Sequence, residues 1–155
     1  MASVKRVLIV GGGSAGMTFA TALQRSGIDV ANVEINPTWS VMRLVYRPFG
    51  SLLVPPPWFR GRVLLVGDVA HTCTSHMASG ARIAIEDAIV LTELLQSDVP
   101  VSELLEKFMA RRYEHCRMVV ESSHPMATWE KSPNTPGADP VGMLARANAA
   151  LAAPI

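Results

Sequence analysis

The chain has 155 residues, of which 49% are hydrophobic and 17% charged, and its formal net charge at pH 7 is +1. An average globular domain carries about 25% charged residues, so the composition excludes a disordered tail and a nucleic-acid module held by charge. The apolar runs are too short and interrupted for a membrane span, which needs about 20 apolar residues, so we expect one globular domain with an excess of apolar side chains.

The beginning of the chain has the pattern of a βαβ unit. Residues 4–10 are a short β-branched run, typical of a strand buried on both faces. Residues 15–23 repeat apolar side chains at helical spacing, and Gly27 is placed to end that helix. Residues 29–34 then predict a second strand.

The next part of the chain is less regular. Residues 41–46 are a candidate strand, and the prolines at 55–57 predict a rigid extended connector. Residues 63–66 are a third candidate for a buried strand. We therefore predict an α/β fold with about three parallel strands, in the order second, first, third, flanked by helices.

The last half of the chain predicts helices. Residues 81–95 carry a broad apolar face, and Ser102 is a plausible N-cap for a helix that runs to about residue 123. After a linker at residues 132–140, residues 141–153 predict a short alanine-rich helix. We expect the basic side chains of the long helix on its solvated face: Arg111, Arg112 and Arg117.

A glycine-rich turn joins the first strand to the first helix, and an acid ends the second strand. Of the three glycines, one makes the tight turn, one lets a pyrophosphate approach the backbone, and one lets helix and strand pack closely. The helix N-terminus offers N–H groups and partial positive charge to phosphates, and the acid can bind both ribose hydroxyls. The residues expected to bind the dinucleotide are Gly11, Gly13, Ser14, Ala15, Gly16 and Glu34.

A second motif reads Gly67-Asp68-Val69-Ala70-His71 and is followed by a helix with the pair Asp87-Ala88. Together the two motifs resemble those of the FAD-dependent aromatic hydroxylases, the class A flavin monooxygenases. The resemblance implies a Rossmann-type FAD-binding fold, an aspartate that binds the ribityl chain, and a following turn whose N–H groups approach the flavin pyrimidine edge. It adds these expected cofactor contacts: Gly67, Asp68, Gly80, Ala81 and Arg82.

The chain also departs from that family. It passes almost directly from the second strand to the second motif, so the resemblance implies a truncated fold whose substrate-binding region is deleted, with a junction near residues 39–44. Residues 1–131 would form a minimal FAD-binding domain, and residues 132–155 a linker and a C-terminal helical extension. Ala78 stands where the family commonly has glycine.

Three other features have competing interpretations. Arg82 would either tune the flavin from its pyrimidine edge or be a solvated or space-filling side chain. The run His71-x-Cys73-x-x-His76 has zinc-ligand residue types, but its span is short and no fourth ligand is evident, so we expect no metal. Cys73 has no identifiable base, so no catalytic side chain is assigned and the flavin would carry the chemistry.

The function implied by the resemblance is an FAD-binding flavoprotein, a miniature oxidoreductase that uses NAD(P)H and oxygen on a small-molecule substrate. We expect a cytoplasmic location by default, because two cysteines form no disulfide framework and the apolar run at residues 7–10 is too short for a secretory signal. The alternative is a dinucleotide-binding module without turnover, either a carrier or a relic of deletion, and a third interpretation is a metal-binding structural protein. The chain keeps the apolar composition of a protein interior although the implied deletion removes the layer that would cover it, so we also expect a homo-oligomer, most simply a two-fold dimer. We expect neither nucleic acid nor membrane as a partner.

Overall fold

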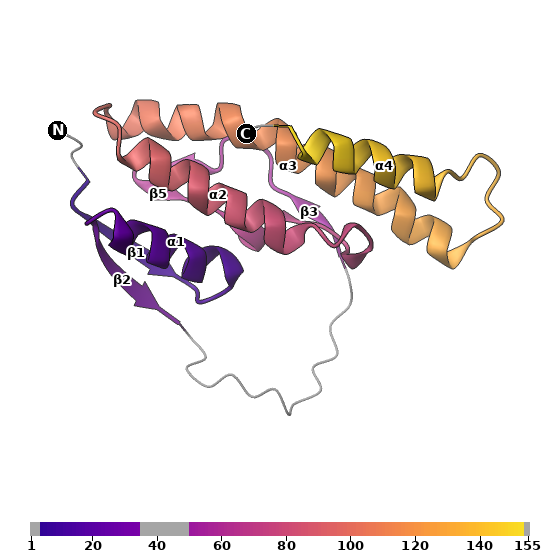
Figure 1. Ribbon diagram of the computed structural model, residues 1–155, viewed down its shortest axis with the longest axis horizontal. Coiled ribbons are helices and arrows are strands. Elements are labelled where there is room, and N and C mark those ends of the chain that lie inside the picture. The colour runs from indigo at the N-terminus through magenta and orange to yellow at the C-terminus, as the bar shows by residue number, and fades with distance from the viewer. Residues whose placement is uncertain (1–3, 35–49, 154–155) are drawn as a thin grey trace.

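A computed structural model describes residues 4–34 and 50–153 and confirms the βαβ unit. Strand β1 (Arg6–Val10) leads into helix α1 (Ser14–Arg25), which returns to strand β2 (Asp29–Val33) (Figure 1). The two strands pair in parallel, with Arg6 opposite Asp29. The candidate strand at 41–46 and the predicted junction at 39–44 lie outside the described residues.

The outer face of this two-stranded sheet is exposed, so the prediction that the first strand is buried on both faces is wrong. Ile9 is buried and belongs to the same core as α1. Leu8, Val10 and Val33 are 63%, 80% and 54% exposed. Successive side chains of a strand point to opposite faces, and within the described ranges only the inner face is covered by a helix.

The four later strands are two residues long and form antiparallel pairs. The predicted third strand is half of a hairpin that turns at Gly61, whose φ is +62°, and it does not pair with β1 in the described residues. Leu65 donates its N–H to the carbonyl of Trp58 at 2.8 Å, which extends the hairpin. The prediction of parallel strands is therefore confirmed for two of about three. The pairs are β3 (Leu52–Leu53) with β6 (His71–Thr72), and β4 (Phe59–Arg60) with β5 (Val63–Leu64).

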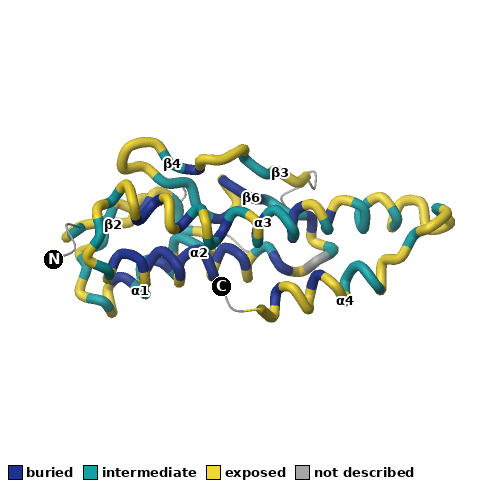
Figure 2. The backbone as a smooth tube through the Cα atoms, turned by 90° about the horizontal axis from the view of Figure 1, so that it is seen from above, coloured by how far each residue is buried: buried dark blue, intermediate teal, exposed yellow. Residues whose placement is uncertain are grey.

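Three helices form the rest of the fold. Helix α2 (Gly80–Leu95) packs on both α1 and α3 (Val101–Lys131). Many of the protein's buried residues belong to this helix (Figure 2). Helix α4 (Pro140–Leu151) runs back along the second half of α3 (Figure 1). Helix α3 starts before Ser102 and continues through Pro125, further than predicted, where α4 supplies packing that the local sequence does not reveal.

Among the described residues, no helix is both long and apolar enough to cross a membrane.

Ala78 has a left-handed backbone at the end of the short helix η2 (Ser75–Met77), with φ at +48°. A Cβ atom is unfavourable in that conformation, so Ala78→Gly is expected to raise the free energy of unfolding by about 0.5–1 kcal/mol, since the relief of strain exceeds the added chain entropy of glycine. Urea unfolding of the two proteins tests this. A loss of stability in the glycine variant would contradict the conformation of this turn.

Candidate functional site

The glycine turn forms an open cradle at the start of α1. Gly11 has φ at +111° and donates its N–H to the carbonyl of Val33 at 2.8 Å. A Cβ on Gly16 would overlap the Gly11 carbonyl oxygen, inside the 3.0 Å that real Cβ atoms respect, so the turn requires glycine there. At Gly11 and Gly13 a Cβ would meet nothing within 4 Å.

Helix α1 begins in this open space. Its N-cap residue is Gly13, which has no side chain to cap the first-turn N–H groups, and the first turn holds no acidic residue. A helix N-terminus of this kind fits a phosphate, because its N–H groups and dipole favour an anion. The Glu34 carboxylate lies at the same turn and accepts a hydrogen bond from the Gly12 N–H.

The second motif packs directly against this cradle. Gly67 opens the short helix η1 (Gly67–Val69) with φ at +67°, and a Cβ placed on it would lie 2.9 Å from the Cβ of Ala15 in the first turn of α1. Asp68 follows and is exposed. The Thr72 hydroxyl donates to the Asp68 carbonyl at 2.6 Å, which fixes the backbone of η1. The fold thus brings the two sequence motifs together.

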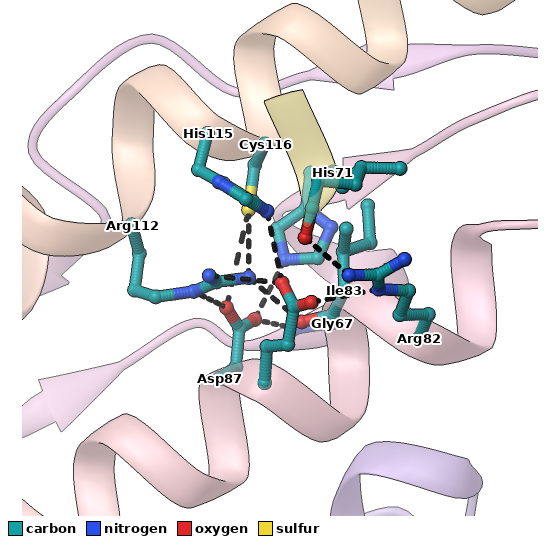
Figure 3. Close-up of polar contacts among 10 residues, drawn as sticks. Gly67, His71, Arg82, Ile83, Asp87, Arg112, His115 and Cys116 are labelled. Atoms are coloured by element: carbon teal, nitrogen blue, oxygen red, sulfur yellow. Dashed lines mark hydrogen bonds and ion pairs between the residues drawn. The ribbon is translucent and has the colours of Figure 1, made fainter. Parts of the chain in front are cut away.

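Asp87 on α2 is the centre of a buried polar cluster behind the second motif (Figure 3). Its Oδ2 accepts the Gly67 N–H at 2.9 Å and lies 2.6 Å from His71 Nε2. Its Oδ1 accepts Arg112 Nε–H at 2.8 Å. Both carboxylate oxygens are therefore used, and the contact to Gly67 ties α2 to the residue before Asp68.

Arg112 is fully buried, so its predicted place on the solvated face of α3 is wrong. Besides Asp87, its guanidinium contacts Glu86 Oε2 at 3.1 Å and the Ile83 carbonyl at 3.0 Å. The spacing Phe108, Arg112, Cys116 places it on the apolar stripe of the helix, four residues from each neighbour. That spacing is the signal that sequence reasoning missed.

The remaining predicted residues lie at the start of α2. Gly80 and Ala81 form its first turn. Arg82 is exposed but not free, because its Nε donates to Glu86 Oε1 at 3.0 Å and its Nη2 donates to the Leu151 carbonyl. In this structure Arg82 joins α2 to the end of α4.

Among the described residues, the run His71, Cys73 and His76, whose residue types alone suggested a metal, does not converge as one ligand set. The cluster that does converge is His71, Asp87 and Cys116, with ligand atoms within 4.8 Å of one another. The Arg112 guanidinium lies among them, 3.5 Å from Cys116 Sγ, and its charge disfavours a cation at this place. Burial raises the pKa of the Cys116 thiol, so it stays protonated and is a poor ligand.

The Asp87 carboxyl is expected to make the free energy of unfolding depend on pH in the acid range. Burial alone raises its pKa, but the hydrogen bond and charge of His71 and the charge of Arg112 outweigh burial and hold the pKa below the ordinary 3.8. Such a group contributes its full stability above the ordinary pKa, and that contribution is lost as pH falls through the lower folded value. We expect urea unfolding midpoints to drop steeply below about pH 4.

Asp87→Asn/Arg112→Met is the comparison protein for that titration, because it lacks the ionisable carboxyl. An equal acid-induced drop in this variant would contradict the assignment to Asp87.

Residues 53–123 match the FAD binding domain family. Over 86 residues the chain is 36% identical to 6-hydroxynicotinate 3-monooxygenase of Bordetella bronchiseptica, covering 52% of this chain and 21% of the relative. Over 58 residues it is 41% identical to 3-hydroxybenzoate 6-hydroxylase 1 of Aquipseudomonas alcaligenes, covering 37% and 15%. The structure of 2,6-dihydroxypyridine-3-hydroxylase from Arthrobacter nicotinovorans superposes with a TM-score of 0.52 at 26% identity, covering 58% of this chain and 23% of that one.

Residues 53–123 are thus similar to the FAD binding domain, and the relatives that the chain matches are FAD-dependent aromatic hydroxylase monooxygenases, in line with the resemblance of its motifs. The matched segment contains Gly67, Asp68, Asp87 and Arg112. The chain spans about a fifth of the first relative's length and less of the second.

Proposed function

We propose that the chain binds FAD, with the pyrophosphate at the N-terminus of α1 and the ribityl chain at Asp68. The observation that carries the proposal is the packing of Gly67 against Ala15, which joins the glycine turn at the start of α1 to the aspartate of the second motif. Bound there, FAD would supply the electron-transfer chemistry for oxidising a reduced nicotinamide nucleotide.

Each part of the cofactor has a candidate partner among the chain's own residues. The N–H groups of Ser14, Ala15 and Gly16 begin α1 and would hold phosphate oxygens. Glu34 lies at the same turn, where its carboxylate would accept hydrogen bonds from the adenosine ribose. The exposed Asp68 would accept hydrogen bonds from the ribityl hydroxyls.

The start of α2 would face the flavin ring. Gly80 and Ala81 would present first-turn N–H groups to its pyrimidine edge. Because Arg82 already pairs with Glu86 and the Leu151 carbonyl, its role toward the ring would be to hold α4 at this end of α2.

Titration of the purified chain with FAD tests the proposal, read by flavin fluorescence and the visible spectrum. Saturable binding is expected, followed by bleaching on anaerobic addition of NADH or NADPH. Absence of binding would overturn the proposed function. Binding without bleaching would favour the alternative, a flavin-binding module without turnover.

Admission of oxygen to the reduced protein separates two further outcomes. Hydroxylation of a small aromatic substrate would show that the activity of the longer relatives survives in this short chain. Release of hydrogen peroxide in stoichiometric amount would show an oxidase-like reaction with no product oxygenation.

We also propose that the chain forms a two-fold dimer through the outer face of β1 and β2. Leu8, Val10 and Val33 are exposed together on this face, and burying them between two copies is favourable by about 25 cal/mol per Å². Light scattering after size exclusion is expected to give twice the chain mass, and Val10→Lys is expected to give a monomer. A monomeric wild-type chain would contradict this proposal.

A further inference from the structure

Asp87 and Arg112 form a connection that starts on α3 and ends at the glycine turn. Arg112 on α3 holds the Oδ1 atom of Asp87 on α2, and the Oδ2 atom of Asp87 holds the Gly67 N–H. Gly67 in turn packs against Ala15 at the start of α1. The contacts of Asp87 with Arg112 and with Gly67 are buried (Figure 3), and the three contacts join different pairs of elements.

The geometry of Asp87 leaves it no direct role toward a ligand. Its side chain is fully buried, and both oxygens are occupied by Gly67, His71 and Arg112. Asp68, the residue after Gly67, is exposed in contrast to Asp87. Because the buried Asp87 carboxylate holds the N–H of Gly67, it also sets the position of the next residue, the exposed Asp68.

We propose that Asp87, held by Arg112, is the positioning residue that fixes Gly67 and Asp68 relative to the glycine turn before any ligand binds. This inference rests on the proposed function, because the distance that it fixes separates the expected phosphate partners from the expected ribityl partner. The affinity for a ligand that contacts both the glycine turn and Asp68 depends on that distance. The affinity for a ligand that occupies the glycine turn alone does not.

Two matched double variants test the proposal. Asp87→Asn/Arg112→Met removes both charges and keeps an oxygen that can accept the Gly67 N–H. Asp87→Leu/Arg112→Met removes the same charges and that acceptor. Because both variants remove Asp87 and Arg112 together, neither leaves one member of this ion pair buried without the other; both are expected to fold, and their melting temperatures give the matched control for stability.

Binding of two ligands is measured for each variant. FAD would reach both the glycine turn and Asp68, whereas ADP lacks the ribityl and flavin portions and would occupy the glycine turn alone. We expect FAD affinity to be about 10- to 100-fold weaker in the leucine variant than in the asparagine variant, the cost of freeing a hydrogen-bonded loop. ADP affinity is expected to be the same in both. Equal FAD affinities, or an equal loss of ADP affinity, would overturn the positioning role.

A measurement on the wild-type protein keeps the proposal testable if either variant fails to fold. Hydrogen exchange at the Gly67 amide is expected to be slow without ligand, because its acceptor is buried and already in place. Exchange at the rate of an exposed amide would overturn the inference. Failure of wild-type FAD binding would instead overturn the proposed function, and the ligand-free exchange result distinguishes the two failures.

Discussion

Replacing Arg112 with methionine is expected to lower the free energy of unfolding by about 3–5 kcal/mol, because it leaves the Oδ1 atom of the buried Asp87 carboxylate without its guanidinium partner. Asp87 and Arg112 are both fully buried, and their contact of 2.8 Å is surrounded by the apolar core. Urea unfolding measured by circular dichroism gives the loss directly. The double variant Asp87→Asn/Arg112→Met is expected to recover most of it, since it also removes the stranded charge.

Arg117 on the same helix is the matched control. It forms ion pairs with Glu114 and Glu121 at the surface, where its side chain is 40% exposed. Exposed pairs of this kind contribute up to about 1 kcal/mol, so Arg117→Met is expected to cost little. Equal losses from the two substitutions would show that Arg112 is not buried against Asp87 in solution.

Replacing Gly16 with alanine is expected to cost about 3 kcal/mol or more and to abolish FAD binding. The added Cβ would overlap the carbonyl oxygen of Gly11, and a backbone atom cannot move away as a flexible side chain can. The turn would have to open, which displaces the first N–H groups of α1. Thermal unfolding and FAD titration measure the two effects.

Gly13→Ala separates binding from folding at the same turn. Its Cβ would meet nothing within 4 Å, and its φ of −68° suits alanine, so the loss of stability is expected to stay within about 1 kcal/mol. FAD affinity is nevertheless expected to fall, because the methyl group enters the space that a pyrophosphate would occupy. Unchanged FAD affinity would place the phosphates elsewhere.

The order of local elements at the N-terminus could be predicted because each element has its own signal. A short apolar run, three spaced glycines and a helical repeat define β1, the turn and α1 without help from distant residues. Gly27, with φ at +75°, ends the helical region as its position indicated. The motif that contains Gly67 and Asp68 could likewise be recognised from adjacent residues alone.

Burial could not be predicted from the same signals. Residues 7–10 are all apolar, yet Val10 is exposed and Ile9 is buried, because exposure depends on which face of β1 receives α1. The run 63–66 looked like a central strand, but the turn at Gly61 pairs it with its neighbour in the chain. A tight turn that brings two neighbouring segments together decides the pairing of such a short strand, and its apolar composition alone does not reveal this.

The sequence by itself therefore determined the glycine turn, the Gly67-Asp68 motif, the βαβ unit and the apolar excess, because these depend on residue type and close spacing. The tertiary structure decided which apolar side chains stay exposed, among them Leu8, Val10 and Val33 on the outer face of β1 and β2. It also decided that a basic residue within a charged stretch is buried: Arg112 is held there because Asp87, from another helix, supplies the opposite charge. A charge can be buried only where a distant residue neutralises it, and that partnership exists only in the folded chain.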